Sequence, residues 1–267
     1  MPVRPLPPAL AEKARLELNE TPKVLEESIR HLKQWISTQP HLRVRTDDQW
    51  LAAFLRGCKF RLDQTKIKLD LYFSFRSTAP YLYSVKYYEP KFMDIINTGA
   101  TVILPKTKNP ADPRVILYRI GKIDLKKYTI IDILSVLVLQ EQICLMEDDN
   151  FVVAGTVNVV DLDGARLGHY TQTSIKQLRN LIAANQIIVH TKNLESFYES
   201  VPKEILPEEY GGTGDSIQDC IDHWKNKMRD YSSFFEDDLK YGSDESKRPG
   251  KSEPAVINDP FRRLELD

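Results

Sequence analysis

The sequence is poor in cysteine, and the three cysteines that it has lie far apart. Cys58, Cys144 and Cys220 are too few and too scattered among 267 residues for a disulfide framework or a zinc site. An excess of charge is also missing, because 37 Lys and Arg stand against 38 Asp and Glu, a formal net charge of -1. Global charge therefore points to neither a nucleic-acid nor a membrane partner, and any basic site must be local. A reducing cytoplasm suits such a chain.

Long hydrophobic runs are absent as well. The most apolar stretch, Ile130 to Leu139, is interrupted by Asp132 and Ser135. It has about half of the roughly 20 residues that a membrane-spanning helix needs. The first 20 residues contain no apolar core of signal-peptide length. We therefore expect neither a signal peptide nor an integral membrane protein.

Enzyme motifs are missing too: the chain has no phosphate-binding glycine loop, no H-E-x-x-H and no G-x-S-x-G. His169 and Ser174 could serve a Ser–His site, but a histidine that orders a loop is favoured because no nucleophile motif accompanies it. Asp161 and Asp163 before Gly164 are similar to the start of a calcium loop without its Glu at position twelve, so a turn is favoured. No enzyme, cofactor or metal is predicted.

The first 80 residues are predicted to be helical. Thr21-Pro22 is an N-cap followed by proline, Thr46 to Gln49 reads as a capping box, and Asp63 can cap a third helix that ends near Pro80. Apolar residues recur at helical spacing behind each start, which indicates a compact helical subdomain. These stripes are Leu25, Ile29, Leu32 and Ile36; Leu51, Phe54, Leu55 and Cys58; and Ile67, Leu71 and Phe75.

Beyond this subdomain the period changes to alternating strands and helices. Short β-branched runs bounded by turn residues predict strands, and longer periodic runs predict helices. This alternation indicates a largely parallel α/β sheet covered by helices. The expected strands are Thr101 to Leu104, Arg114 to Ile120, Phe151 to Val160 and Ile187 to His190; the helices are Ile133 to Met146, opened by Thr129 to Asp132, and Thr173 to Ala184.

The C-terminal part is expected to hold one helix and little else. That helix runs from Ser216 to roughly Phe235. The segment from Tyr241 to Asn258 is rich in Gly, Ser, Lys, Glu and Pro and is predicted to be disordered. Phe261, Leu264 and Leu266 alternate with polar residues, so the end of the tail is predicted to dock as a short extended piece.

Glu141 carries two interpretations. It lies among apolar neighbours on the predicted helix from Ile133 to Met146, where an unpaired carboxylate would be costly. Gln140 and Gln142 favour a helix that turns outward at this point. The functional alternative is a polar anchor inside an apolar cavity, as in small-molecule sites.

Four segments resemble successive motifs of the CRAL-TRIO family, in the order in which that family has them. They are Phe54 to Phe60, Val115 to Asp124, Val159 to Gly164 with His169, and Ile205 to Gly212. Together they cover most of residues 20–240. Within that family, the chain most resembles members of the alpha-tocopherol-transfer and retinaldehyde-binding types.

The resemblance implies a carrier rather than an enzyme. It implies an N-terminal helical subdomain (residues 1–80), an α/β lipid-binding domain with a mostly parallel sheet (81–212), and a C-terminal helix with a mostly disordered tail (213–267). Such proteins bind one hydrophobic molecule, such as a tocopherol, a retinoid or a phospholipid, and exchange it between membranes. They act in the cytoplasm and contact membranes transiently.

The resemblance also implies which positions would line a lipid pocket. Ordinary core packing explains the apolar ones equally well, but Thr156 and Asn158 would be polar on an inner face of the sheet and would need a partner. Thr156, Asn158 and Val160 should share one face because side chains alternate along a strand. The full set is Tyr118, Leu134, Leu137, Glu141, Thr156, Asn158, Val160, Leu167 and Leu181.

The chain departs from the family pattern after Gln186. The family has a strand, a helix and a mobile gate between the predicted helix ending at Ala184 and the strand at Ile187, where this chain has only Asn185-Gln186. Roughly 30 to 40 residues are expected to be missing, about the size of a βαβ unit. The pocket would then lack its lid, and most of a phosphoinositide-binding cluster would be lost except Lys59. The alternative to a carrier is therefore a truncated, non-transferring module that binds a protein or a membrane.

Overall fold

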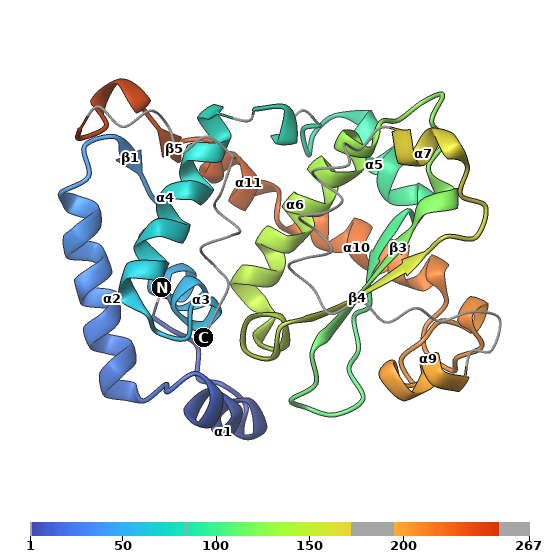
Figure 1. Cartoon of the computed structure of the whole chain (residues 1–267), viewed down its shortest axis with the longest axis horizontal. Helices are drawn as coiled ribbons and strands as arrows, with labels where there is room; N and C mark the ends of the chain where they lie inside the picture. The colour runs from blue at the N-terminus through green and yellow to red at the C-terminus, as the bar shows by residue number, and fades with distance from the viewer. Residues whose placement is uncertain (1, 79, 84, 172–194, 251–267) are drawn as a thin grey trace.

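The computed structural model describes residues 2–78, 80–83, 85–171 and 195–250 (Figure 1). Helices α1 to α4 lie together on one side of the molecule, and a small sheet with its covering helices lies on the other. Helix α6 runs between the two groups. The predicted α/β class, with a helical region before a sheet flanked by helices, is confirmed.

The helical subdomain consists of four helices whose starts were only partly predicted. Thr21 caps α2 as expected, since its hydroxyl accepts a hydrogen bond from the Val24 amide. The capping box predicted at Thr46 is wrong: α3 starts one residue later, and its N-cap Asp47 makes no side-chain cap. The helices are α1 (Pro8–Glu17), α2 (Pro22–Ser37), α3 (Asp48–Gly57) and α4 (Leu62–Thr78).

Helix α4 also presents a different face to the core from the one predicted. It begins at Leu62, so Asp63 lies inside its first turn rather than at its cap. Leu69 and Phe73 are completely buried, whereas Ile67 is 54% exposed. The predicted stripe from Ile67 is therefore wrong, because α4 is apolar on several sides and only tertiary packing selects the buried one.

The main sheet has three strands in the order β2-β3-β4. Strands β2 and β3 are antiparallel, whereas β3 and β4 are parallel. The first two were predicted almost to the residue, but the run from Phe151 begins as a helical turn (Asn150–Ala154), and the strand starts only at Thr156. The strands are β2 (Thr101–Ile103), β3 (Arg114–Arg119) and β4 (Thr156–Asp161). The expected strand Ile187 to His190 and helix Thr173 to Ala184 lie outside the described residues.

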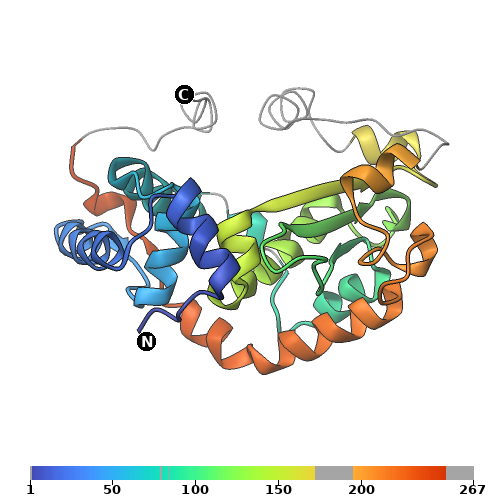
Figure 2. The same ribbon diagram turned by 90° about the horizontal axis from the view of Figure 1, so that it is seen from below.

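Helices cover one face of this sheet (Figure 2). The indole of Trp224 on α10 donates a hydrogen bond of 2.7 Å to the carbonyl of Ile103, which fastens α10 to β2. Helix α6 opens at Thr129 to Asp132 as predicted, and the structure shows that Thr129 and Asp132 form a capping box there. The covering helices are α5 (Pro90–Thr98) and α10 (Ile217–Asp230). The helix between the sheet and the helical subdomain is α6 (Ile130–Glu147), and the shorter helices of this part are α7 (Leu167–Thr171) and α9 (Glu195–Ser200). No helix in the described part of the chain is long and apolar enough to cross a membrane.

The C-terminal region returns to the helical subdomain. The helix predicted from Ser216 is interrupted at Tyr231, and α11 (Ser232–Asp238) follows. Residues 239–250, here called the C-terminal strap, then form β5 (Gly242–Ser243), which pairs with β1 (Leu42–Arg43).

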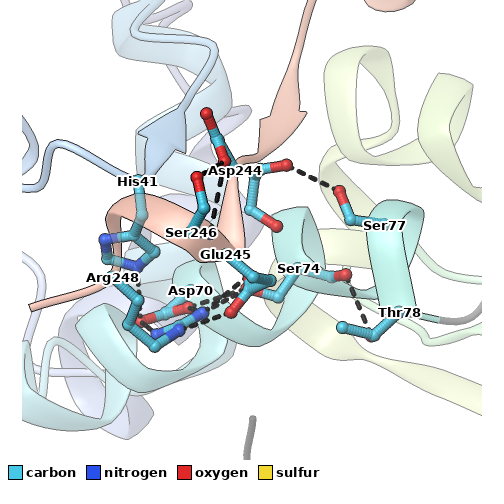
Figure 3. Close-up of polar contacts among 10 residues, drawn as sticks. His41, Asp70, Ser74, Ser77, Thr78, Asp244, Glu245, Ser246 and Arg248 are labelled. Carbon is cyan, nitrogen blue, oxygen red and sulfur yellow. Dashed lines mark hydrogen bonds and ion pairs between the residues drawn. The ribbon is translucent and has the colours of Figure 1, made fainter. Parts of the chain in front are cut away.

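Ion pairs hold the end of the strap in place (Figure 3). The guanidinium of Arg248 donates to both carboxylate oxygens of Asp70, at 2.7 and 2.8 Å, and also contacts Ser74. The predicted disorder from Tyr241 is therefore wrong as far as Gly250, because long-range pairs supply the order that composition alone does not. The predicted docking of Phe261, Leu264 and Leu266 lies outside the described residues.

Candidate functional site

The outer face of strand β4 is the most open part of the sheet. Thr156, Asn158 and Val160 share this face, as predicted, and all three are exposed. Val157 and Val159 point the other way and pack against the main core. Strand β4 therefore has one packed face and one open face that combines two polar side chains with an apolar one.

On the neighbouring strand β3 the same face is covered. Ile116 is the register partner of Asn158, yet it is only 1% exposed. Arg114 at the start of β3 forms a bidentate ion pair with Asp148, the C-cap of α6. Its Nε and Nη2 atoms lie 2.6 and 2.9 Å from the two carboxylate oxygens. Because this ion pair fixes the C-terminal end of α6 beside β3, the helix borders the open face of β4.

Tyr118 and Glu141 stand where β3, β4 and α6 meet. Tyr118 is the register partner of Val160, and burial raises the pKa of its phenol, with a further contribution from the negative charge of Glu141. Burial also raises the pKa of Glu141 to about 7. A carboxyl group that is partly protonated at neutral pH can donate a hydrogen bond as well as accept one.

The two glutamines beside Glu141 do not mark an outward turn of the helix. Gln140 and Gln142 are each only 1% exposed, so that interpretation is wrong for them. Both side-chain polar atoms of Gln142 and the carbonyl oxygen of Gln140 are buried without a hydrogen-bond partner. Burying an amide group without a hydrogen-bond partner costs free energy in a folded protein. The stretch of α6 around Glu141 therefore holds polar groups that are buried but not hydrogen-bonded.

The other predicted pocket positions are dispersed. Leu137 is buried in the main core, and Leu134 packs against that core. Leu167 on α7 is 78% exposed, and Leu181 lies outside the described residues. Lys59 is exposed in the turn between α3 and α4, within the helical subdomain and not on the sheet. The structure thus brings Tyr118, Glu141 and the β4 residues together, and it places Lys59 in the other part of the molecule.

His169 and the turn after β4 have structural contacts. The two ring nitrogens of His169 lie 3.1 Å from the carbonyl oxygens of Arg166 and Ile123, an arrangement that orders this loop. Asp161 accepts hydrogen bonds from the Asp163 amide and from the Tyr210 hydroxyl. Among the described residues, no group of three or more His, Cys, Asp or Glu side chains could hold a metal ion. The Ser174 of the alternative Ser–His site lies outside the described residues.

Sequence reasoning missed two features of this region. Leu162, just after β4, is 54% exposed and extends the apolar part of the open face. The Arg114–Asp148 pair was also missed, although a charged residue at the edge of each apolar run was a visible signal. Leu162 lies within the motif segment Val159 to Gly164, but that motif does not mark it as part of the face, and Arg114 and Asp148 are 34 positions apart in the chain.

The chain is similar in sequence to one family model and to several known proteins. A family model described as "Pinta-like, UBA domain" matches residues 21–89, which span α2 to α4. Human Clavesin-2 is 26% identical over 92% of this chain and 85% of its own length. Rat Clavesin-1 is 27% identical over 78% of this chain and 69% of its own length. The clavesin matches over most of the chain suggest the CRAL-TRIO family, which is also the family that the sequence motifs resemble.

Proposed function

We propose that this chain binds one hydrophobic lipid, of the tocopherol, retinoid or phospholipid class, and carries it between membranes without chemistry. The observation that supports it most is the open face of β4, where Val160 and Leu162 are each more than half exposed. A monomeric protein seldom leaves neighbouring apolar side chains uncovered unless they contact a ligand or a partner.

The polar groups at the border of this face support a ligand with one polar end. Thr156 and Asn158 can donate and accept hydrogen bonds from the face itself. Glu141 and Tyr118 lie at its border, and the raised pKa of Glu141 allows it to stay partly neutral near pH 7. An apolar surface with a few polar groups of this kind is typical of small-molecule sites.

We also propose that the chain lacks an internal segment that its relatives have. The alignment with human Clavesin-2 spans 285 positions, more than the 267 residues of this chain, and contains 92% of them, or about 246. About 39 aligned positions therefore have no counterpart here. The alignment with rat Clavesin-1, with 247 positions and 78% of the chain, or about 208 residues, leaves the same number. Both numbers support a gap of the size expected after Gln186.

The second candidate function is a truncated module that binds a protein or a membrane and transfers no lipid. The exposure of Leu167 on α7, in addition to Val160 and Leu162, favours it, because these side chains offer a binding surface even without a closed cavity. We also propose that Lys59 contacts phosphoinositide-containing membranes transiently. One lysine binds phosphate weakly, so this contact is short-lived. Cytoplasmic action agrees with the three free, buried cysteines.

Native mass spectrometry of freshly purified protein tests both functions. A carrier should retain a hydrophobic ligand in nearly one-to-one amount, and Val160→Asp should lose it, because a carboxylate would stand in the apolar part of the site. The matched control is Leu16→Asp, since Leu16 is 62% exposed on α1, away from the sheet. A binding module should instead form a concentration-dependent oligomer or complex that only Val160→Asp weakens. Ligand-free monomer at every concentration would contradict both functions.

A further inference from the structure

A cavity lies away from the sheet face, between the helical subdomain and the C-terminal region. Its volume is about 280 Å³, just below the usual range of about 300–1,000 Å³ for small-molecule sites. Helix α4, the segment after it, α6, α11 and the strap all contribute to its lining. No residue of the β4 face contributes, so the two sites are separate.

The walls of this cavity are mainly apolar. Leu139 of α6 and Phe235 of α11 line it together with the buried Val85. The rings of Tyr83 and Tyr87 complete this part of the lining. Such walls accommodate a short alkyl chain or one aromatic ring rather than a fully hydrated ion.

The lining also carries positive charge that nearby carboxylates do not offset. Arg43 and Lys86 line the cavity, and their printed hydrogen bonds go to backbone carbonyls, those of Lys240 and Tyr83. Neither cation has a carboxylate partner among the ion pairs of the described residues. Arg76 also lines the cavity, and its Nε is buried without a hydrogen-bond partner.

The carboxylates of α11 are already engaged. Asp238 pairs with both Arg45 and Arg76, and Asp237 pairs with Arg45 and Lys240. Glu236 accepts a hydrogen bond of 3.2 Å from the Tyr87 hydroxyl. Arg43 and Lys86 are therefore the cations left to attract a negative group in the cavity.

We propose that this cavity binds a small amphipathic organic anion, of the class of medium-chain carboxylates. The apolar part lies against Leu139, Val85 and Phe235, and the carboxylate faces Arg43 and Lys86. Charge-assisted hydrogen bonds from arginine or lysine to a carboxylate are about twice as strong as neutral ones. The uncharged alcohol of equal chain length therefore binds more weakly.

Titration calorimetry of the full chain with decanoate, below its micelle concentration, tests the proposal. We expect saturable one-to-one binding and, for decanol, affinity lower by roughly tenfold or more. The double substitution Arg43→Ala with Lys86→Ala should weaken decanoate binding to the same degree. The matched control, Arg30→Ala with Lys126→Ala, removes two exposed cations elsewhere and should leave it unchanged.

A second pair of variants separates this cavity from the sheet face. Leu139→Trp fills the cavity and should abolish decanoate binding, whereas Val160→Asp should not affect it. Circular dichroism verifies that each variant is folded. Equal affinities for decanoate and decanol, no binding at all, or binding that Val160→Asp removes and Leu139→Trp leaves would overturn the proposal. The last result would assign the anion to the lipid site proposed above, and that function would stand.

Discussion

Tyr118 and Val160 are register partners on the parallel strands β3 and β4, but Val160 is 55% exposed whereas Tyr118 is largely covered. The exposure of the side chain thus changes from one strand to the next. The reason is that α6 borders β3, whereas the described helices leave the same face of β4 open. The boundary between covered and open sheet therefore runs between two adjacent residues, and Glu141 lies close enough for its charge to raise the pKa of the Tyr118 phenol.

The Arg114–Asp148 pair is expected to contribute strongly to stability. Arg114 is 9% exposed and also donates a hydrogen bond to the carbonyl of Leu104, so Arg114→Met leaves the Asp148 carboxylate poorly compensated. We expect a loss of about 2–4 kcal/mol in the free energy of unfolding, measured by urea denaturation. Lys13→Met, in the more exposed pair with Glu17, should cost less than about 0.5 kcal/mol. Equal losses would contradict this role for Arg114.

Glu141 should make stability depend on pH in a defined window. Its pKa is raised from 4.5 to about 7, so the folded state binds more protons than the unfolded state between these values. Stability from this group is then complete below pH 4.5 and is lost as the pH rises through about 7. Because the side chain is partly exposed, we expect Glu141→Gln to be more stable than the parent by about 1–2 kcal/mol at pH 8.

The same pair of proteins should differ much less at pH 5, where the carboxyl group is mostly protonated. Urea denaturation of parent and variant at pH 5, 6, 7 and 8 measures the difference, in which the contributions of other groups cancel. A difference that stays constant over this range would show that Glu141 titrates normally.

The N-cap of α2 offers a direct test of local sequence reasoning. Thr21→Ala removes the hydroxyl that accepts a hydrogen bond of 3.2 Å from the Val24 amide. The substitution should lower the free energy of unfolding by about 1 kcal/mol. Thr46→Ala serves as the control, because Thr46 is exposed and α3 starts after Asp47 without a side-chain cap. Its effect should lie within about 0.5 kcal/mol. A larger loss for Thr46→Ala, measured by thermal unfolding, would restore the capping box that the sequence predicted.

Local patterns predicted the elements whose signals lie within a few residues. The Thr21-Pro22 pair and the segment Thr129 to Asp132 located the starts of α2 and α6, because helix caps are short-range contacts. Period-two alternation placed Thr156, Asn158 and Val160 on one face of β4. The resemblance to one family supplied the role of that face, which remains a proposal.

Long-range contacts explain what the sequence did not predict. The apolar run from Phe151 has the pattern of a strand. The Asp148 carboxylate, which pairs with Arg114, accepts a hydrogen bond from the Phe151 amide, and a helical turn starts there instead. The cavity at Arg43 and Lys86 is built from segments that lie nearly 200 residues apart in the chain. No window of local sequence contains both partners of such contacts.

The C-terminal strap has a consequence for how the protein is made. Rings from the C-terminal region complete the core of the helical subdomain: Phe234 packs on Trp50, and Tyr241 packs on Phe73. Synthesis proceeds from the N-terminus, and domains generally fold in that order. Here the first subdomain cannot finish its packing until residues beyond Tyr241 have left the ribosome. Until then the apolar side chains around Trp50 and Phe73 remain uncovered, within reach of chaperones that act during translation.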